Sequence, residues 1–134
     1  MRKILALTLC VIILIGLIPI SAYAQNAVPF YNNVLNHSET FVIDENGDVQ
    51  ISVSYSGQKN ILESADIKVT LKKCVLWIFW NDVEVWTDSS TNYYYYNTFS
   101  TNVGGGTYRA LIEYTFNGNN GSPDIITQEI EKSC

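Results

Sequence analysis

Apolar and polar residues alternate with a period close to two along most of the chain after residue 38. The alternation is clearest in segments 49–56, 65–73 and 107–116, where an apolar side chain stands at every second position. A period of two places one set of side chains on each face of an extended strand, so that one face packs on a core and the other meets water. No comparable stretch keeps a helical apolar stripe with caps. The pattern therefore predicts an all-β domain.

Turn-forming residues divide the alternating segments into strands. Asn46-Gly47 is the preferred centre of a tight hairpin because both residues tolerate positive φ, and Asn81-Asp82 is expected to interrupt the fourth strand. The expected strands are 39–44, 49–56, 65–73, 75–86, 93–101, 107–116 and 124–131. Short strands at this spacing predict an immunoglobulin-like antiparallel β-sandwich of about seven strands, with a small closed β-barrel as the alternative.

The N-terminal segment has the order of residues found in secretory signals. Arg2 and Lys3 precede an apolar run over 4–20, and the small residues of Ala22-Tyr23-Ala24 follow it. This order predicts a cleavable signal peptide at 1–24 and a secreted, extracellular protein. An uncleaved membrane anchor is the alternative, but the run is shorter than the roughly 20 residues of a spanning helix. Segment 25–38 is expected to be a loosely ordered lead-in to the sandwich domain at 39–134.

Net charge limits the partners that the exported chain would meet. The whole sequence has 8 basic and 13 acidic residues, and removal of Arg2 and Lys3 would leave 6 against 13, a net charge of −7. Nucleic acids and anionic lipid surfaces both require a basic footprint. We therefore expect no nucleic-acid partner and no membrane association after signal cleavage.

Catalytic and cofactor motifs are not evident. His37-Ser38 lacks the surroundings of an activated nucleophile, and a lone histidine at this position is expected to be exposed. Gly104-Gly105-Gly106 precedes a predicted strand, so it indicates a turn and not a phosphate-binding loop, which needs a helix behind it. The sequence predicts a protein that is not an enzyme and that carries no metal or cofactor.

Aromatic residues are concentrated in the segment 77–99. Both alternating sets of its strands contain bulky rings, so one core face cannot bury all of them. If Val83 and Val85 face the core, Trp86 points outward. Trp80, Trp86, Tyr94 and Tyr96 are accordingly the candidate ligand-binding residues. Exposed rings on a β-sandwich suit the apolar faces of sugars or a protein partner, whereas the plainer interpretation is that the rings pack on each other.

These features predict a secreted, non-catalytic binding module that meets an extracellular glycan or protein. The alternative is a structural protein that self-associates through aromatic-rich edge strands. The composition leaves the oligomeric state open. A structural role is expected for Tyr108, which starts a strand where sandwich proteins often place a buried tyrosine whose hydroxyl bonds to upstream backbone.

Several short segments also resemble a known group of proteins. The segments are Ile67–Lys73, Leu76-Trp77, Val83–Trp86, and Gly106–Arg109 leading into Tyr114-Thr115. Over roughly the last two-thirds of the chain they resemble small secreted bacterial proteins with one immunoglobulin-like domain. The resemblance implies the fold and export, and the group has no assigned activity.

Cys74 and Cys134 are the two cysteines of the expected mature chain, and an exported protein with an even count usually pairs them. A two-cysteine metal site is the competing interpretation, but it would need further ligands, and His37 is distant in the sequence. In an immunoglobulin-like sandwich, strands 65–73 and 124–131 both run antiparallel to 107–116 and hence parallel to each other. Both cysteines are therefore expected at the same end of the sandwich.

Overall fold

The structure, a computed structural model, describes residues 31–133, and this part of the chain is all β. The predicted signal peptide and the first residues of the predicted lead-in lie outside the described residues. The strands are β1 (Val34–Ile43), β2 (Asp48–Gly57), β3 (Leu62–Val75), β4 (Phe79–Ser90), β5 (Tyr94–Asn102), β6 (Thr107–Gly118) and β7 (Asp124–Ser133).

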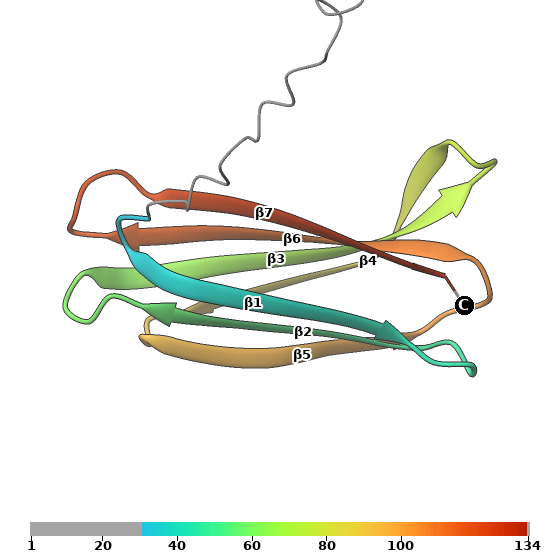
Figure 1. The fold of residues 1–134 in the computed structure, drawn as a ribbon, viewed down its shortest axis with the longest axis horizontal. Helices are drawn as coiled ribbons and strands as arrows, with labels where there is room; N and C mark the ends of the chain where they lie inside the picture. Colours follow the sequence, from blue (N-terminus) through green and yellow to red (C-terminus); the bar gives the residue numbers. More distant parts are fainter. Residues whose placement is uncertain (1–30, 134) are drawn as a thin grey trace, which may run out of the picture.

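Two antiparallel sheets face each other (Figure 1). One has the order β1-β2-β5 and the other the order β4-β3-β6-β7. The predicted immunoglobulin-like β-sandwich is thus confirmed, and the closed-barrel alternative is wrong. The order departs from a constant-type immunoglobulin domain in one strand, because β4 pairs with β3 and does not lie beside β5.

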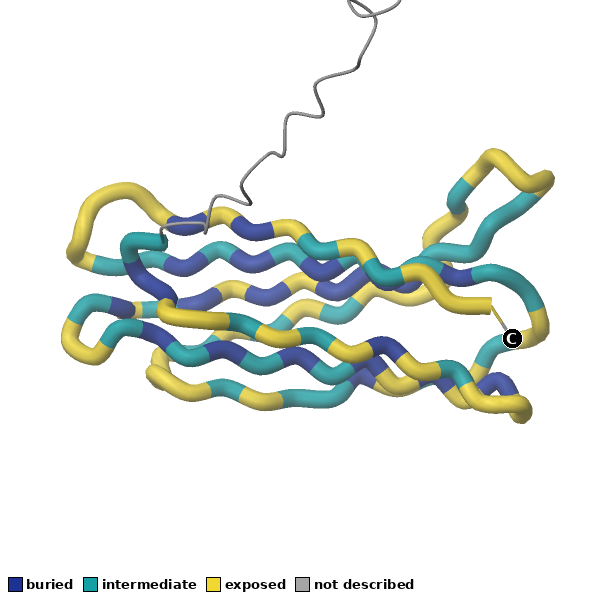
Figure 2. Tube along the Cα trace, viewed as in Figure 1, coloured by how far each residue is buried: buried dark blue, intermediate teal, exposed yellow. Residues whose placement is uncertain are grey.

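The core is built from the alternating apolar positions of the two inner faces. Val49, Ile51, Val53 and Tyr55 of β2 are buried, and the intervening serines of the same strand are half-buried. Facing them are buried residues of β3 and β6, among them Ile112, Tyr114 and Phe116. Figure 2 shows the resulting alternation of buried and more exposed positions along the strands.

The first strand starts earlier than the sequence analysis predicts. β1 begins at Val34, so that residues 34–38 belong to the sheet and not to a loosely ordered lead-in. Asn33, just before it, is fully buried. Its backbone amide donates to the carboxylate of Asp124 at 2.7 Å, and its side-chain amide donates to the carbonyls of Phe116 and Ser122 at 3.2 and 3.1 Å. These bonds fasten the start of β1 to the connection between β6 and β7.

The hairpin expected at Asn46-Gly47 is present, but its turn is centred one residue earlier. The Gly47 amide donates to the Asp44 carbonyl at 3.1 Å, which makes Glu45 and Asn46 the central residues. Only Gly47 of the predicted pair has a positive φ, of 79°. A Cβ at this position would lie 1.9 Å from the Val103 carbonyl oxygen, so the close approach of the connection between β5 and β6, residues 103–106, requires glycine here.

The connection between β3 and β4 differs most from the sequence prediction. The turn lies at 76–78, between the paired residues Val75 and Phe79, whereas Asn81-Asp82 lies inside β4 and continues the pairing with β3. A register shift between Leu71 and Lys72 leaves Val83 without a partner and bends β4 at this point. The resulting hairpin projects from one end of the sandwich (Figure 1). Within residues 31–133, no helix is long and apolar enough to cross a membrane.

Candidate binding site

The structure divides the four predicted binding residues among three places. Tyr94 and Tyr96 lie together on the outer face of the three-stranded sheet, because they stand at alternate positions of β5. Trp80 lies on the outer face of the other sheet, beside Arg109. Trp86 points inward between the sheets. Only the two tyrosines therefore form a common surface.

The Tyr94 and Tyr96 side chains extend into solvent with exposed fractions of 75% and 72%. Their neighbours across the sheet are serines of β2, since Tyr94 pairs with Ser56 and Tyr96 pairs with Ser54. The next residues of this row, Asn36 and Ser38 of β1, are also small or polar. The outer face of the three-stranded sheet thus presents two flat rings beside a field of hydroxyl and amide groups.

Hydroxyl groups surround the phenol oxygen of Tyr96. The Thr98 hydroxyl donates to it at 3.2 Å, and the Ser52 and Thr98 oxygens lie 2.9 Å apart. Hydrogen bonds from Ser52 and Thr98 lower the pKa of the Tyr96 phenol. A shallow hollow of about 240 Å³ lies alongside, lined by Ser38, Thr40, Ser52, Val53, Ser54 and Tyr96. This arrangement offers a ring face for stacking and several groups that both donate and accept hydrogen bonds.

Trp86 does not have the exposed position predicted for it. It pairs with the fully buried Val69, and side chains of paired residues point to the same face of a sheet. The indole is half-buried, packs against the core and lies 5.8 Å from the Phe99 ring, centroid to centroid. Val83 and Val85 are instead 43% and 46% exposed. The prediction was wrong because it assigned the valines to the core; in β4, an edge strand, the large indole faces the core and Val85 faces outward.

Trp80 is half-buried under a cationic group. The Arg109 guanidinium lies 4.0 Å from the centroid of the indole ring, within the range of a cation–π contact. Arg109 also contacts Glu131 at 3.2 Å and Glu129 at 3.6 Å. One face of the Trp80 ring is therefore occupied by Arg109 within the protein.

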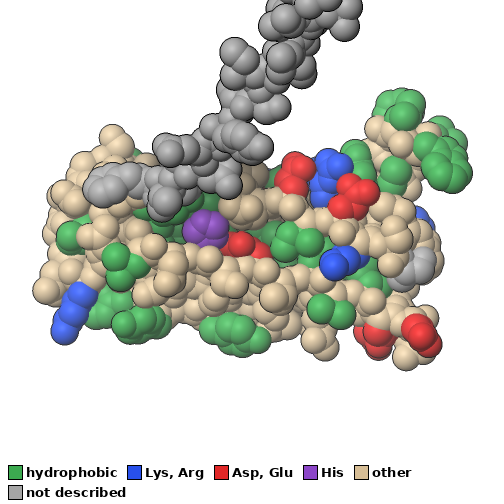
Figure 3. Space-filling model, viewed as in Figure 1, with side chains coloured by type: hydrophobic (Ala, Val, Ile, Leu, Met, Phe, Trp, Pro, Cys, Tyr) green, Lys and Arg blue, Asp and Glu red, His purple; other side chains and the backbone are tan. Residues whose placement is uncertain are grey.

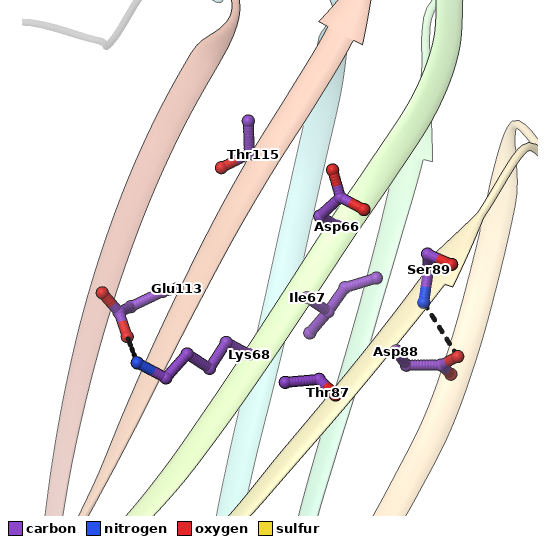
Figure 4. Close-up of a pocket in the computed structure, with 8 residues that line it drawn as sticks. All are labelled: Asp66, Ile67, Lys68, Thr87, Asp88, Ser89, Glu113 and Thr115. Carbon is purple, nitrogen blue, oxygen red and sulfur yellow. Dashed lines mark hydrogen bonds and ion pairs between the residues drawn. The ribbon is translucent and has the colours of Figure 1, made fainter.

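A second, larger hollow of about 550 Å³ lies on the outer face of the four-stranded sheet (Figure 4). Its lining residues are polar or charged apart from Ile67, and Lys68 and Glu113 point toward one another at 3.4 Å. Asp66 and Thr115 are paired on the same two strands. The hollow has no aromatic ring, and its one cation is already paired with a carboxylate. Among residues 31–133, no group of three or more His, Cys, Asp and Glu side chains is arranged to hold a metal ion.

Two polar contacts inside the sandwich involve titratable groups. The Tyr95 hydroxyl and the Asn97 amide both donate to the Asp88 carboxylate. Hydrogen bonding, first from Tyr95, lowers the pKa of Asp88. Burial, and next the bond to Asp88, raises the pKa of Tyr95 to about 12. This contact joins β4 of one sheet to β5 of the other.

The second contact contains the only histidine of the chain. His37, expected to be exposed, is half-buried, and its Nδ1 lies 2.7 Å from Glu39 Oε1. The same oxygen accepts a hydrogen bond of 2.7 Å from the Tyr114 hydroxyl. Burial, followed by the bond to Glu39, raises the pKa of Tyr114. Both contacts tie strands of the two sheets together.

Four consecutive exposed apolar residues of the described chain were not among the predicted binding residues. These are Leu76, Trp77, Ile78 and Phe79, with exposed fractions of 74, 95, 71 and 57%, at the end of the β3–β4 hairpin. We call this segment, Leu76–Phe79, the apolar tip. Figure 3 shows hydrophobic side chains gathered on the projecting hairpin. The run of apolar residues from Val75 to Trp80 was the available signal, but it was assigned to a continuing strand of which only some rings were expected to reach solvent.

Cys74 is half-buried and carries a free thiol in this structure. It lies beside Leu76, Trp77 and Thr107. Its predicted partner, Cys134, lies outside the described residues, so the predicted disulfide remains a prediction. Comparison of the chain with protein-family models and with curated protein sequences finds no match.

Proposed function

We propose that this protein is a secreted, non-catalytic binding module, and that its principal ligand is an extracellular glycan held on the Tyr94/Tyr96 face. The observation that carries the proposal is the pair of rings, each more than 70% exposed, beside the hydroxyl-rich rows of β1 and β2. Export is supported by the N-terminal sequence pattern, and membership in the small secreted immunoglobulin-like group is supported by the resemblance.

A glycan fits this face for three physical reasons. A sugar ring has an apolar face that stacks on an aromatic ring, and its hydroxyls exchange hydrogen bonds with groups such as those of Ser52, Ser54 and Thr98. The outward residues nearest the two tyrosines, namely Ser38, Thr40, Ser52, Ser54, Ser56 and Thr98, are uncharged, so this part of the face does not select for an ionic ligand. The hollow beside Tyr96 lies on the outer surface of the sheet and is not enclosed, so a bound sugar could be part of a longer chain.

The test is a binding assay on insoluble cell-wall polysaccharides, followed by titration with soluble oligosaccharides from any fraction that retains the protein. We expect Tyr94→Ala/Tyr96→Ala to lose at least about tenfold in affinity, since each ring contact contributes on the order of 1 kcal/mol. Ile125→Ala is the matched control, because Ile125 is 76% exposed on the opposite sheet. Equal retention of all three proteins, or of none, contradicts the proposal.

Self-assembly is the second candidate, and one observation favours it. β4 is a twelve-residue edge strand, and its outer face presents the partly exposed Val83 and Val85. An edge strand with exposed apolar side chains can pair with the edge of a second copy. Light scattering over a range of concentrations tests this candidate: a growing mass that Val85→Lys abolishes supports assembly, and a constant monomer mass rules it out.

A further inference from the structure

The apolar tip is an exposed surface whose residues have no role in the core. It comprises four consecutive large apolar side chains, and Trp77 at its end is 95% exposed. No charged residue occurs between Lys73 and Asp82. Apolar residues scattered singly on a surface need no explanation, but a continuous apolar segment on a projection marks an interaction site.

The backbone of the tip adds a second, independent observation. Leu76 and Trp77 have φ values of 52° and 70°, and the Ile78 amide donates to the Val75 carbonyl at 3.4 Å. Two successive positive φ values at the centre of a β-turn are those of a type I′ turn, which strongly prefers Asn and Gly. Bulky side chains are strained in this conformation. Leucine and tryptophan are therefore unfavourable at these positions in two ways, because their apolar side chains are exposed to water and their φ values are strained. Stability of the fold does not account for them.

The charged residues at the end of the sandwich next to the tip bear on which kind of surface the tip contacts. Four of the six basic residues of the described chain lie in two adjacent rows at this end of the sandwich, namely Lys72, Lys73, Arg109 and Lys132. Lys73 precedes Leu76 by three residues, which is about 10 Å along a strand. The polar headgroup region on each side of a bilayer is on the order of 5 to 8 Å thick. The basic rows would thus lie near the phosphates when the tip enters the apolar layer.

We propose that the apolar tip inserts into the outer layer of a lipid bilayer and so attaches the module to a membrane surface without spanning it. A fluid bilayer accepts a convex apolar projection in any orientation, whereas a protein partner or a second copy would need a pocket that matches its shape. The partners of the basic rows, including Asp82 on Lys72 and Glu131 on Arg109, make this band nearly neutral. Zwitterionic lipid headgroups suit such a band better than strongly anionic ones.

The depth of insertion is limited by the backbone. The three-residue connection makes one internal hydrogen bond, from Ile78 to Val75, and its remaining polar groups must keep contact with water or headgroups. Tryptophan also favours the membrane–water interface. The net negative charge of the chain was the reason to expect no membrane association. That charge governs long-range attraction to anionic lipid, and it does not oppose the insertion of an uncharged tip.

The experiment is flotation of the protein, at residues 25–134, with phosphatidylcholine vesicles. The test variant is Leu76→Asn/Trp77→Gly, which introduces the preferred type I′ pair and should fold at least as stably as the natural chain. We expect the natural chain to float with the vesicles and the variant to lose about tenfold or more in partitioning, because it removes two exposed apolar side chains. The matched control is Leu35→Asn/Ile125→Asn, which removes two similarly exposed side chains elsewhere and should float like the natural chain.

Brominated lipids supply a second readout, because they quench a tryptophan only when it enters the bilayer. Quenching in the natural chain that is lost in Trp77→Phe, while Trp80 and Trp86 remain, supports insertion of the tip. The proposal is overturned if the natural chain does not float, or if the test variant floats equally well. Flotation that requires anionic lipid and disappears in salt regardless of the tip also overturns it, as does tip-dependent self-association without lipid.

Discussion

The Asp124 carboxylate receives a 2.7 Å hydrogen bond from the backbone amide of Asn33, 91 residues earlier in the chain. It also accepts from the amides of Asn32 and Val34 at 2.8 and 3.2 Å. Both Asp124 and Asn33 are buried. One side chain at the start of β7 therefore satisfies three backbone donors where the chain enters β1, and it determines where the sandwich begins.

Replacement of Asp124 by asparagine should destabilise the fold. One carboxylate oxygen becomes an amide group that cannot accept, so at least one backbone donor loses its partner. We expect the free energy of unfolding to fall by about 2 kcal/mol, the range for an unsatisfied buried donor to a charged acceptor. Urea unfolding followed by tryptophan fluorescence measures it. Glu63→Gln, at an exposed position, is the control, and equal midpoints for the two variants would contradict this role.

Tyr108 has the buried position that its place at the start of β6 predicts. Its ring is 1% exposed, and its hydroxyl donates to the Gly104 carbonyl at 2.7 Å. Tyr108→Phe should lower the free energy of unfolding by about 1 kcal/mol through loss of this bond. Tyr94→Phe, which removes a hydroxyl from an exposed ring, should leave the midpoint of urea unfolding unchanged. A Tyr108→Phe protein as stable as the natural chain would show that the bond has no net value.

The elements predictable from sequence are those in which local pattern and tertiary packing agree. A strict period of two is kept in segments 49–56, 65–73 and 107–116, because each forms a strand that lies between two others and buries one face. The sequence therefore predicted β2, β3 and β6 to within a few residues of their observed bounds. The fold class also predicted that β3 and β7 each pair with β6, one on either side of it, and this placement is confirmed.

The elements that the sequence did not predict depend on long-range contacts or on strain. β1 extends back to Val34 because Asp124 binds its start, and no local pattern reports a partner 90 residues away. The β3–β4 turn falls on Leu76-Trp77, residues that turn preferences disfavour, so Asn81-Asp82 was the better local candidate. Because the turn was predicted at Asn81-Asp82, the residues of the apolar tip were placed inside a strand and not at the end of a hairpin. Of the candidate site, Tyr94 and Tyr96 were found from alternation, whereas the inward direction of Trp86 depended on the register of an edge strand.

Trp86 should act on stability and not on ligand binding. Its half-buried indole packs against Phe99 and the core, so Trp86→Ala should cost about 2 kcal/mol, below the range for a fully buried aromatic side chain. Retention on the polysaccharide that the natural chain binds should be unchanged at a temperature where the variant is folded. Thermal unfolding and the retention assay together test this expectation; a stable variant with weakened binding would return Trp86 to the binding surface.

Stability should decline in alkali through Tyr95. Its pKa is raised from 10.0 to about 12 in the folded protein, so the unfolded chain loses this proton at lower pH than the folded chain does. The contribution is fully present below pH 10 and is lost as the pH rises through 12. Tyr95→Phe should therefore flatten the fall in urea midpoint over this interval, although the buried Tyr55 and Tyr114 still contribute to it. Tyr94→Phe is the control, and identical slopes for both variants would contradict the assignment.

The last prediction is a disulfide between Cys74 and Cys134. β3 and β7 run parallel on either side of β6, and Lys73 and Lys132 both pair with Tyr108. Cys74 follows the first of these residues and Ser133 follows the second, so the two chain segments reach the same level at the same end of the sandwich. Two strand spacings separate them, about 10 Å, and a disulfide needs Cα atoms within about 7 Å. Formation of the bond therefore requires Cys134 to reach across β6 toward Cys74.

Closure of this loop of about 60 residues would stabilise the fold by roughly 4 kcal/mol in the chain-entropy treatment. Thiol labelling of the exported protein, unfolded without reductant, should find no reactive cysteine, and reductant should expose two. Cys74→Ser should lower the melting temperature, and Cys134→Ser should lower it equally, because either change opens the same loop. The thiol of Cys74 lies beside Leu76 and Trp77. A disulfide at Cys74 would also fix the base of the β3–β4 hairpin. Without it, only strand pairing would hold the hairpin that carries the apolar tip.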